Sequence, residues 1–166
     1  MFSLTALCLA CALFYDSLPF LPLELPNLSH LTFTINDVVA SASLIDLLVR
    51  MIEMCPFLQK FTLKLISDDH GRNYRRRTIN QFPGFSHQHL KVVEFIGFVG
   101  CPVDLELAFY LLENVTMLEK MIVNTTSPFL METYSEFYDD EKKQANRKRA
   151  EQLKETVPQG VELVIC

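Results

Sequence analysis

One phrase decides the fold of this chain, and residues 56–65 carry it most clearly as PFLQKFTLKL. A turn at the proline is followed by a leading leucine, Leu58, and then by apolar residues in alternation at Phe61, Leu63 and Leu65. Alternate residues of a strand point to the same face of a sheet. The phrase therefore predicts a turn, a leucine packed beneath that turn, and a short strand with three side chains on one face.

The same phrase recurs along the chain. Further copies lie at residues 26–35, 89–96 and 117–123, and a shorter copy closes the chain at residues 160–165. The leading leucines are Leu28, Leu58, Leu90 and Leu118, at intervals of 30, 32 and 28 residues. These intervals lie close to the upper end of the periods found in leucine-rich repeats.

Helical patterns separate the phrases. Residues 43–54 carry apolar side chains at helical spacing, and residues 103–115 begin after Pro102 with acidic residues in the first turn. Residues 139–157 predict a more polar helix on an outer surface. Alternating strands and helices imply a parallel sheet, either a solenoid edge or a small doubly wound sheet. Because the pattern repeats, we predict an α/β fold, a leucine-rich-repeat-like solenoid of short parallel strands alternating with helices.

Composition limits the classes of function. Of the 166 residues, 49% are hydrophobic and 21% are charged, as in a folded domain, and the net charge of -5 argues against a general nucleic-acid binder. The five cysteines are scattered among apolar neighbours, which suits reduced thiols in the cytoplasm or nucleus. We recognise no nucleophile with a base, no paired carboxylates and no phosphate cradle, so we expect no enzyme and no cofactor.

Two short motifs could bind a ligand but have structural interpretations. His87 and His89 are spaced as metal ligands on one strand face would be, yet no acidic or cysteine partner has ligand spacing, so we predict a surface pair. Gly97 and Gly100 have GxxG spacing after a strand. We assign these glycines to the end of the third repeat strand and the close turn into the helix that Pro102 opens.

The second half of the chain also resembles a known family. The residues that carry the resemblance are HLKVVEFIGFVG at 89–100, DLELA at 104–108, LLENV at 111–115, MLEKM at 117–121, RAEQL at 149–153 and VPQGVELVI at 157–165. They resemble the FBD domain, which sits at the C-terminus of many plant F-box proteins. Residues 17–66 resemble the leucine-rich repeats that precede that domain. The chain is thus similar to the C-terminal part of a plant F-box/FBD/leucine-rich-repeat protein.

The resemblance implies a division of the chain and a role. Residues 1–16 form an apolar N-terminal segment, which is either a truncated repeat or outside the family, residues 17–80 form a repeat region with an exposed loop at 67–86, and residues 81–166 form the FBD domain. The family's role is substrate recognition in an SCF-type ubiquitin ligase, in which the F-box binds a Skp-type adaptor. No F-box-like segment precedes residue 17, so we do not carry adaptor binding over to this chain.

The residues and the resemblance together predict a non-enzymatic protein–protein interaction module. Its partner is an unknown protein, with a ubiquitination substrate as the candidate, and we expect no nucleic-acid or membrane partner. A solenoid offers an extended strand face for binding. The candidate contacts are outward strand positions: Thr32, Thr34, Thr62, Lys64 and Glu94. The residues assigned to the structural motif are Leu28, Leu58, Leu90, Gly97, Gly100, Leu118, Pro158 and Gly160.

An alternative function concerns the apolar N-terminal run. As a signal segment, residues 1–15 would make this a secreted or membrane-associated leucine-rich-repeat binding protein. The three N-x-[ST] sequons at Asn27, Asn114 and Asn124 would then be glycosylation sites. In the interaction-module hypothesis, the same run instead covers the exposed first strand of the repeats.

Overall fold

The computed structural model of the chain describes residues 6–11, 25–36, 42–66, 86–126 and 140–166. The predicted loop at 67–86 therefore lies, except for residue 86, outside the described residues. The elements in chain order are β1 (Ala6–Cys11), β2 (His30–Asn36), α1 (Ala42–Glu53), β3 (Lys60–Ile66), β4 (Val92–Ile96), α2 (Pro102–Asn114), β5 (Lys120–Asn124), α4 (Asp140–Ala150), the 3-10 helix η1 (Glu151–Glu155) and β6 (Glu162–Ile165).

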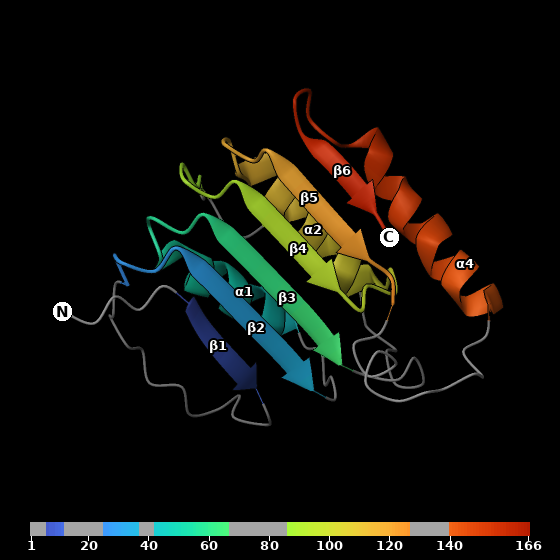
Figure 1. Cartoon of the computed structure of the whole chain (residues 1–166), viewed down its shortest axis with the longest axis horizontal. Coiled ribbons are helices and arrows are strands. Elements are labelled where there is room, and N and C mark those ends of the chain that lie inside the picture. The colour runs from blue at the N-terminus through green and yellow to red at the C-terminus, as the bar shows by residue number, and fades with distance from the viewer. Residues whose placement is uncertain (1–5, 12–24, 37–41, 67–85, 127–139) are drawn as a thin grey trace.

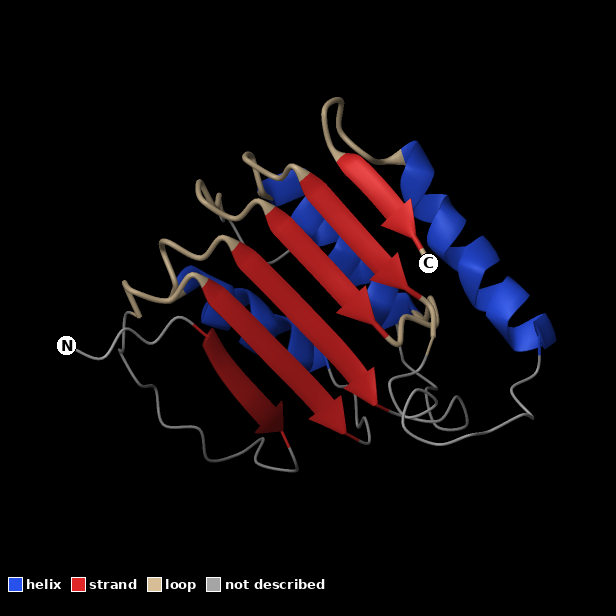
Figure 2. Ribbon diagram, in the orientation of Figure 1, coloured by secondary structure: helices blue, strands red, loops and turns tan. Residues whose placement is uncertain are grey.

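The strands form one parallel sheet whose spatial order, β1-β2-β3-β4-β5-β6, is also the order of the sequence. Figure 1 shows α1 and α2 on the same face of this sheet, and Figure 2 shows the strands lying side by side in front of them. A doubly wound sheet would carry helices on both faces. The one-sided arrangement confirms the predicted leucine-rich-repeat-like fold.

The core lies between the sheet and the helices. Its strand residues are the inward positions of the repeated phrase: Leu31, Phe33, Ile35, Phe61, Leu63, Leu65, Val93, Phe95, Met121 and Val123. The leading leucines Leu28, Leu58, Leu90 and Leu118 are also buried, and α2 adds Leu107, Ala108, Leu111 and Leu112. Burying a leucine or phenylalanine side chain stabilises a fold by about 1.5–3 kcal/mol, so the alternation seen in the sequence is the main source of stability.

Backbone hydrogen bonds close each turn and join it to the next repeat. The N–H of Leu58 donates to the carbonyl of Cys55 at 3.0 Å, and Leu28 and Leu118 make the equivalent bond within their turns. The carbonyl of Ser29 accepts N–H groups from both Gln59 and Lys60 in the following repeat. Lys91 accepts in the same way from Glu119 and Lys120. The turns are therefore stacked as regularly as the strands.

In the third repeat a histidine side chain replaces the turn carbonyl. His87 Nδ1 accepts the N–H of Leu90 at 2.9 Å, and His87 Nε2 lies 2.9 Å from the carbonyl oxygen of Cys55, to which it donates. The predicted surface pair is wrong for His87, which is 5% exposed; His89 is exposed and packs its ring against Phe57. Burial lowers the pKa of His87, and the charge of His89 lowers it further, against the opposing effect of the bond to Cys55.

The sheet contains one strand that the repeated phrase did not predict. Residues 6–11 pair in parallel with β2, from Ala6 opposite His30 to Cys11 opposite Ile35. Their sequence is uniformly apolar or small and lacks the leading leucine phrase, so periodicity alone could not identify the strand. β1 takes the place expected of a cover for the first repeat strand.

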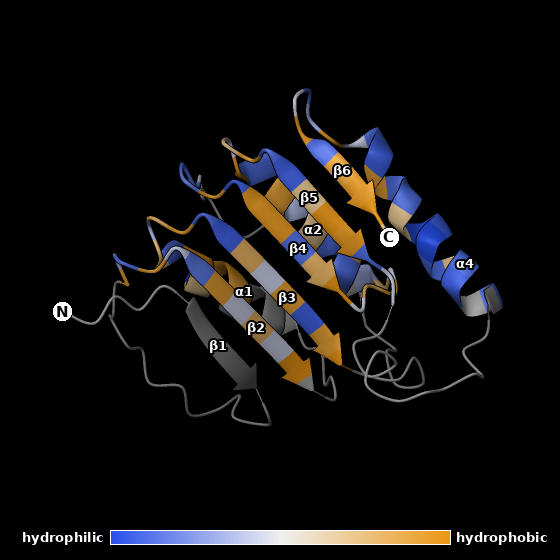
Figure 3. Cartoon of the chain, viewed as in Figure 1, coloured by the Kyte–Doolittle hydropathy of each residue, from blue (hydrophilic) through white to orange (hydrophobic). Residues whose placement is uncertain are grey.

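The helix boundaries agree with the sequence except at the last helix. The patterns at 43–54 and 103–115 form α1 and α2. The continuous helix predicted at 139–157 is wrong in its last part, because α4 ends at Ala150 and the chain tightens into η1. Ala150 and Leu153 are buried there, although α4 is hydrophilic along nearly all of its length (Figure 3).

Two side chains hold Val99 and Gly100 in the loop between β4 and α2. The Asp104 carboxylate accepts the N–H groups of Val99 and Gly100 at 3.1 and 3.2 Å, and Arg149 donates to the carbonyl of Val99 at 3.1 Å. Gly97 and Gly100 have φ angles of 80° and 70°, which glycine adopts without strain. A Cβ at Gly100 would lie 2.5 Å from the Cβ of Arg149. The absence of a side chain at this position lets α4 pack against the loop.

Candidate partner-binding face

The face of the sheet opposite α1 and α2 is not covered by any described element, and we call the outward side chains of β2–β6 the open face (Figure 1). The five predicted contact residues all lie on it. Thr32, Thr62 and Glu94 are in register across β2, β3 and β4, and Thr34 is in register with Lys64. The structure therefore brings the predicted residues together in two adjacent rows across the strands.

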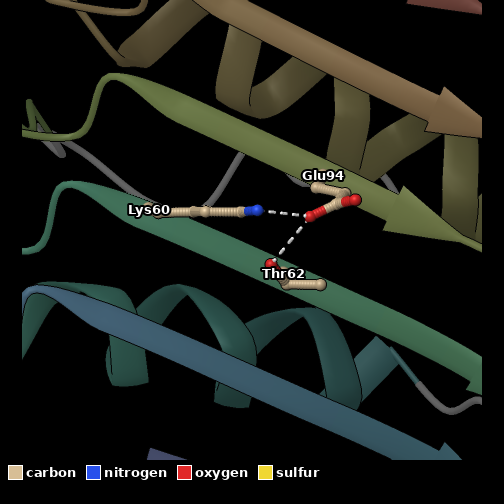
Figure 4. A network of polar contacts seen from close by, with 3 residues as sticks. All are labelled: Lys60, Thr62 and Glu94. Atoms are coloured by element: carbon tan, nitrogen blue, oxygen red, sulfur yellow. Dashed lines mark hydrogen bonds and ion pairs between the residues drawn. The ribbon is translucent and has the colours of Figure 1, made fainter. Parts of the chain in front are cut away.

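A polar network fixes the middle of the open face (Figure 4). Lys60 Nζ lies 2.7 Å from Glu94 Oε2, and the hydroxyl of Thr62 donates to the same oxygen at 3.3 Å. The Lys60 and Glu94 side chains are 36% and 23% exposed. A pair this exposed contributes about 1 kcal/mol at most, so its main effect is to orient the carboxylate. Thr62 is itself only 6% exposed and lies beside Glu94, in register on the neighbouring strand.

The open face also carries partly exposed apolar side chains, interspersed with the polar ones of β4–β6. They are Val92 and Ile96 on β4, Ile122 on β5 and Val164 on β6. The sequence analysis did not name these residues as contacts, because both alternating sets of β4 and β5 contain apolar side chains. Alternation could have identified two of them, since Val92 and Ile96 lie two residues either side of the outward Glu94 on the same strand.

Charged side chains line the starts of the strands at the same face. Lys120 Nζ lies 3.0 Å from Glu162 Oε2 across β5 and β6, in the row that also contains Lys60. In the turns just before β4 and β5, the exposed Lys91 Nζ lies 2.8 Å from Glu119 Oε1. The sequence analysis named none of these four residues as candidates, because a single charge in a strand does not reveal its neighbour on the next strand.

Chemically reactive groups with shifted pKa values lie away from the open face. Burial raises the pKa of the Cys55 thiol and, with the charge of Glu53, raises the pKa of Tyr110 to about 12. Both side chains belong to the hydrophobic core. Within the described ranges, no group of three His, Cys, Asp or Glu side chains could hold a metal ion. No helix of the described part is long and apolar enough to span a membrane. The open face is thus a surface of charged, polar and apolar side chains suited to contact.

Comparisons with known proteins show which family and which relative this chain resembles. The family model described as "At1g61320/AtMIF1, LRR domain" matches residues 1–163. The "F-box/FBD/LRR-repeat protein At5g53840" of Arabidopsis thaliana is 33% identical over 88 residues, which are 51% of this chain and 19% of that protein. The chain therefore spans about a fifth of the length of that relative. No solved structure is significantly similar to the chain.

Proposed function

Because this chain belongs to the leucine-rich-repeat family described as At1g61320/AtMIF1, LRR domain, we propose that it is a non-enzymatic module that binds a protein partner on its open face. The observation that carries the proposal is the set of exposed apolar side chains on that face. Val92, Ile96 and Ile122 are partly exposed on neighbouring strands, and adjacent exposed apolar side chains favour a contact surface.

We also infer a more specific role from the family resemblance. In this proposal residues 81–166 are an FBD domain, and the module acts as the substrate-recognition tail of an F-box subunit of a ubiquitin ligase. The printed name of the Arabidopsis relative, which combines F-box, FBD and leucine-rich repeat, supports this inference. β3 pairs with β4, so the repeat region and the proposed FBD domain would contribute to one continuous binding face.

The test of partner binding compares variants on opposite layers of the fold. The chain is used to capture partners from a plant extract, alongside Ile122→Asp on the open face and Lys148→Glu on the exposed side of α4. We expect the captured set to be lost with Ile122→Asp and kept with Lys148→Glu, after circular dichroism confirms that both variants are folded. Equal capture by all three proteins would refute the open face as the binding surface.

The ligase role has a separate test. Excess of the chain should compete with a full ligase subunit for its substrate, so the captured partner should accumulate in plant cells that overproduce the chain. Immunoblotting measures the half-life of that partner, with Ile122→Asp as the matched control. An unchanged half-life would count against the ubiquitination role. A pull-down with a Skp-type adaptor should show no binding, and binding would overturn that expectation.

A second candidate function, a secreted binding protein, is favoured by one observation. Asn27 begins a sequon and is exposed in the turn before β2. Two observations favour the cytoplasmic or nuclear module instead. Asn114 uses its side-chain N–H to donate to the carbonyl of Tyr110 at 2.8 Å, and loss of residues 1–15 as a signal would remove β1. Treatment of plant-expressed protein with an N-glycosidase separates the two, because a mass shift would support secretion.

A further inference from the structure

The sign of charge on the open face is opposite to that of the whole chain. The chain carries a formal net charge of -5. The charged side chains that point outward on β2–β6 are Lys60, Lys64, Lys120, Glu94 and Glu162, which leaves one excess positive charge. An excess of lysine on one face of an acidic chain favours a partner that brings negative charge to that face.

Lys64 is the residue that carries this excess. Lys60 and Lys120 each have a carboxylate oxygen within 3.0 Å. The register neighbours of Lys64 are Thr34 and Ile96, neither of which is acidic, and no carboxylate of the described residues forms an ion pair with it. The Lys64 side chain is partly exposed, so its ammonium group can pair with a carboxylate of a partner.

Exposed apolar side chains begin next to Lys64. Ile96 is in register with Lys64, whereas Ile122 and Val164 lie in the adjacent row, which contains Glu94. Neighbouring strands are about 4.8 Å apart and adjacent outward rows about 6.8 Å apart, so Lys64 and Val164 lie about 16 Å apart along a diagonal across β3–β6. In an extended peptide, residues i and i+4 lie about 13.6 Å apart on one face. A peptide that crosses the strands obliquely therefore places residue i+4 over Val164 and residue i about 2 Å short of Lys64, a gap that the flexible lysine side chain can span.

We propose that the open face binds an extended peptide segment in which a carboxylate is followed by apolar side chains two and four residues later. The carboxylate pairs with Lys64, and the apolar side chains lie over Ile96, Ile122 and Val164. This inference rests on the proposed function and specifies the chemistry of the partner. The already paired Lys60 and Lys120 keep their own carboxylates and mark the border of the site.

The test uses two pools of fluorescent nine-residue peptides and fluorescence anisotropy with the full chain. One pool carries glutamate at i and Val, Ile or Leu at i+2 and i+4, and the reference pool carries lysine at i. We expect the glutamate pool to bind more tightly, and about fivefold weaker binding of this pool to Lys64→Ala. Lys64→Glu should weaken it further and favour the lysine pool. Lys148→Glu on α4 has the same charge change and should leave binding unchanged.

The outcomes separate this inference from the function on which it rests. Failure of both pools to bind, or equal binding of the two pools to the wild-type chain, would overturn the inference. If both pools bind equally but Ile122→Asp abolishes binding, the chemistry is wrong and the open face remains the binding surface. If binding survives both Lys64→Glu and Ile122→Asp, the proposed function is refuted as well.

Discussion

His87 joins two repeats through two ring nitrogens whose contributions can be removed separately. Nδ1 accepts the N–H of Leu90, and Nε2 donates to the carbonyl of Cys55. His87→Asn keeps an acceptor oxygen at the position of Nδ1 and lacks the donor that reaches Cys55. His87→Gln keeps an amide N–H near the position of Nε2 and lacks the acceptor for Leu90. The two variants therefore form a matched pair, and His87→Ala removes both bonds.

The expected losses of stability follow from what each variant leaves unpaired. In His87→Asn the Cys55 carbonyl still accepts the N–H of Leu58 at 3.0 Å, so the loss is about 1 kcal/mol. In His87→Gln the N–H of Leu90 is buried without an acceptor, which costs about 2 kcal/mol. His87→Ala loses both bonds and leaves a cavity in place of the buried ring, for a total of about 4 kcal/mol.

Urea unfolding at pH 7.5, followed by far-ultraviolet circular dichroism, measures these differences in a chain that has no tryptophan. His89→Gln is the control, because the exposed His89 side chain should tolerate replacement within about 0.5 kcal/mol. The reasoning would be refuted by His87→Gln having wild-type stability while His87→Asn is strongly destabilised. That order would mean that Nε2, and not Nδ1, makes the contact on which the turn depends.

The same histidine predicts a pH dependence of stability. Its pKa in the folded chain is lowered from the ordinary value of 6.5, mainly by burial, so between these two values the unfolded chain binds more protons. The stabilisation is therefore complete above pH 6.5 and is lost as the pH falls from 6.5 toward the folded pKa. His87→Asn cannot titrate, so its urea midpoint should change less than that of the wild type between pH 7.5 and 5. Parallel curves for the two proteins would contradict this.

Two pairs of residues give further predictions. Gly100→Ala should lower the free energy of unfolding by about 3 kcal/mol, because the new Cβ meets Arg149 and the φ angle is positive. Gly160→Ala is the control, with a positive φ but nothing within 4 Å, and should cost about 1 kcal/mol in the same urea experiment; equal losses would argue against the contact. Burial raises the pKa of Cys55, so iodoacetamide should modify the exposed Cys166 in the native protein and reach Cys55 only after unfolding. Mass spectrometry of the peptides measures both rates, and equal native rates would contradict the burial of Cys55.

Much of the fold could be predicted because the inward positions of each strand are strictly apolar. Phe61, Leu63 and Leu65 alternate with polar or small neighbours, and that alternation determines which face is buried. β1 could not be found in this way because its residues do not alternate in polarity. The change from α4 to η1 leaves no clear signal in the sequence, since the helix-compatible residues continue through Glu155.

The candidate site was less predictable because it depends on pairs from different repeats. Glu94 could be placed on the outward face from its own strand, but its partner Lys60 is 34 positions earlier and is recognised only from the register. The apolar outward residues were missed for the opposite reason, because hydrophobicity alone does not separate a contact surface from a core. His87 was misplaced because a histidine that replaces a turn carbonyl has no sequence signature.

The agreement between strand order and sequence order has a consequence for cooperativity. Each strand is hydrogen-bonded only to the strands of the adjacent repeats. The strands in the middle of the sheet can therefore stay paired while an outer strand detaches. Amide hydrogen exchange should then slow gradually from the two outer strands toward β3 and β4. A ligand lying across β3–β6 would bind only while these four strands remain paired. We therefore expect it to make the four strands open together rather than one at a time.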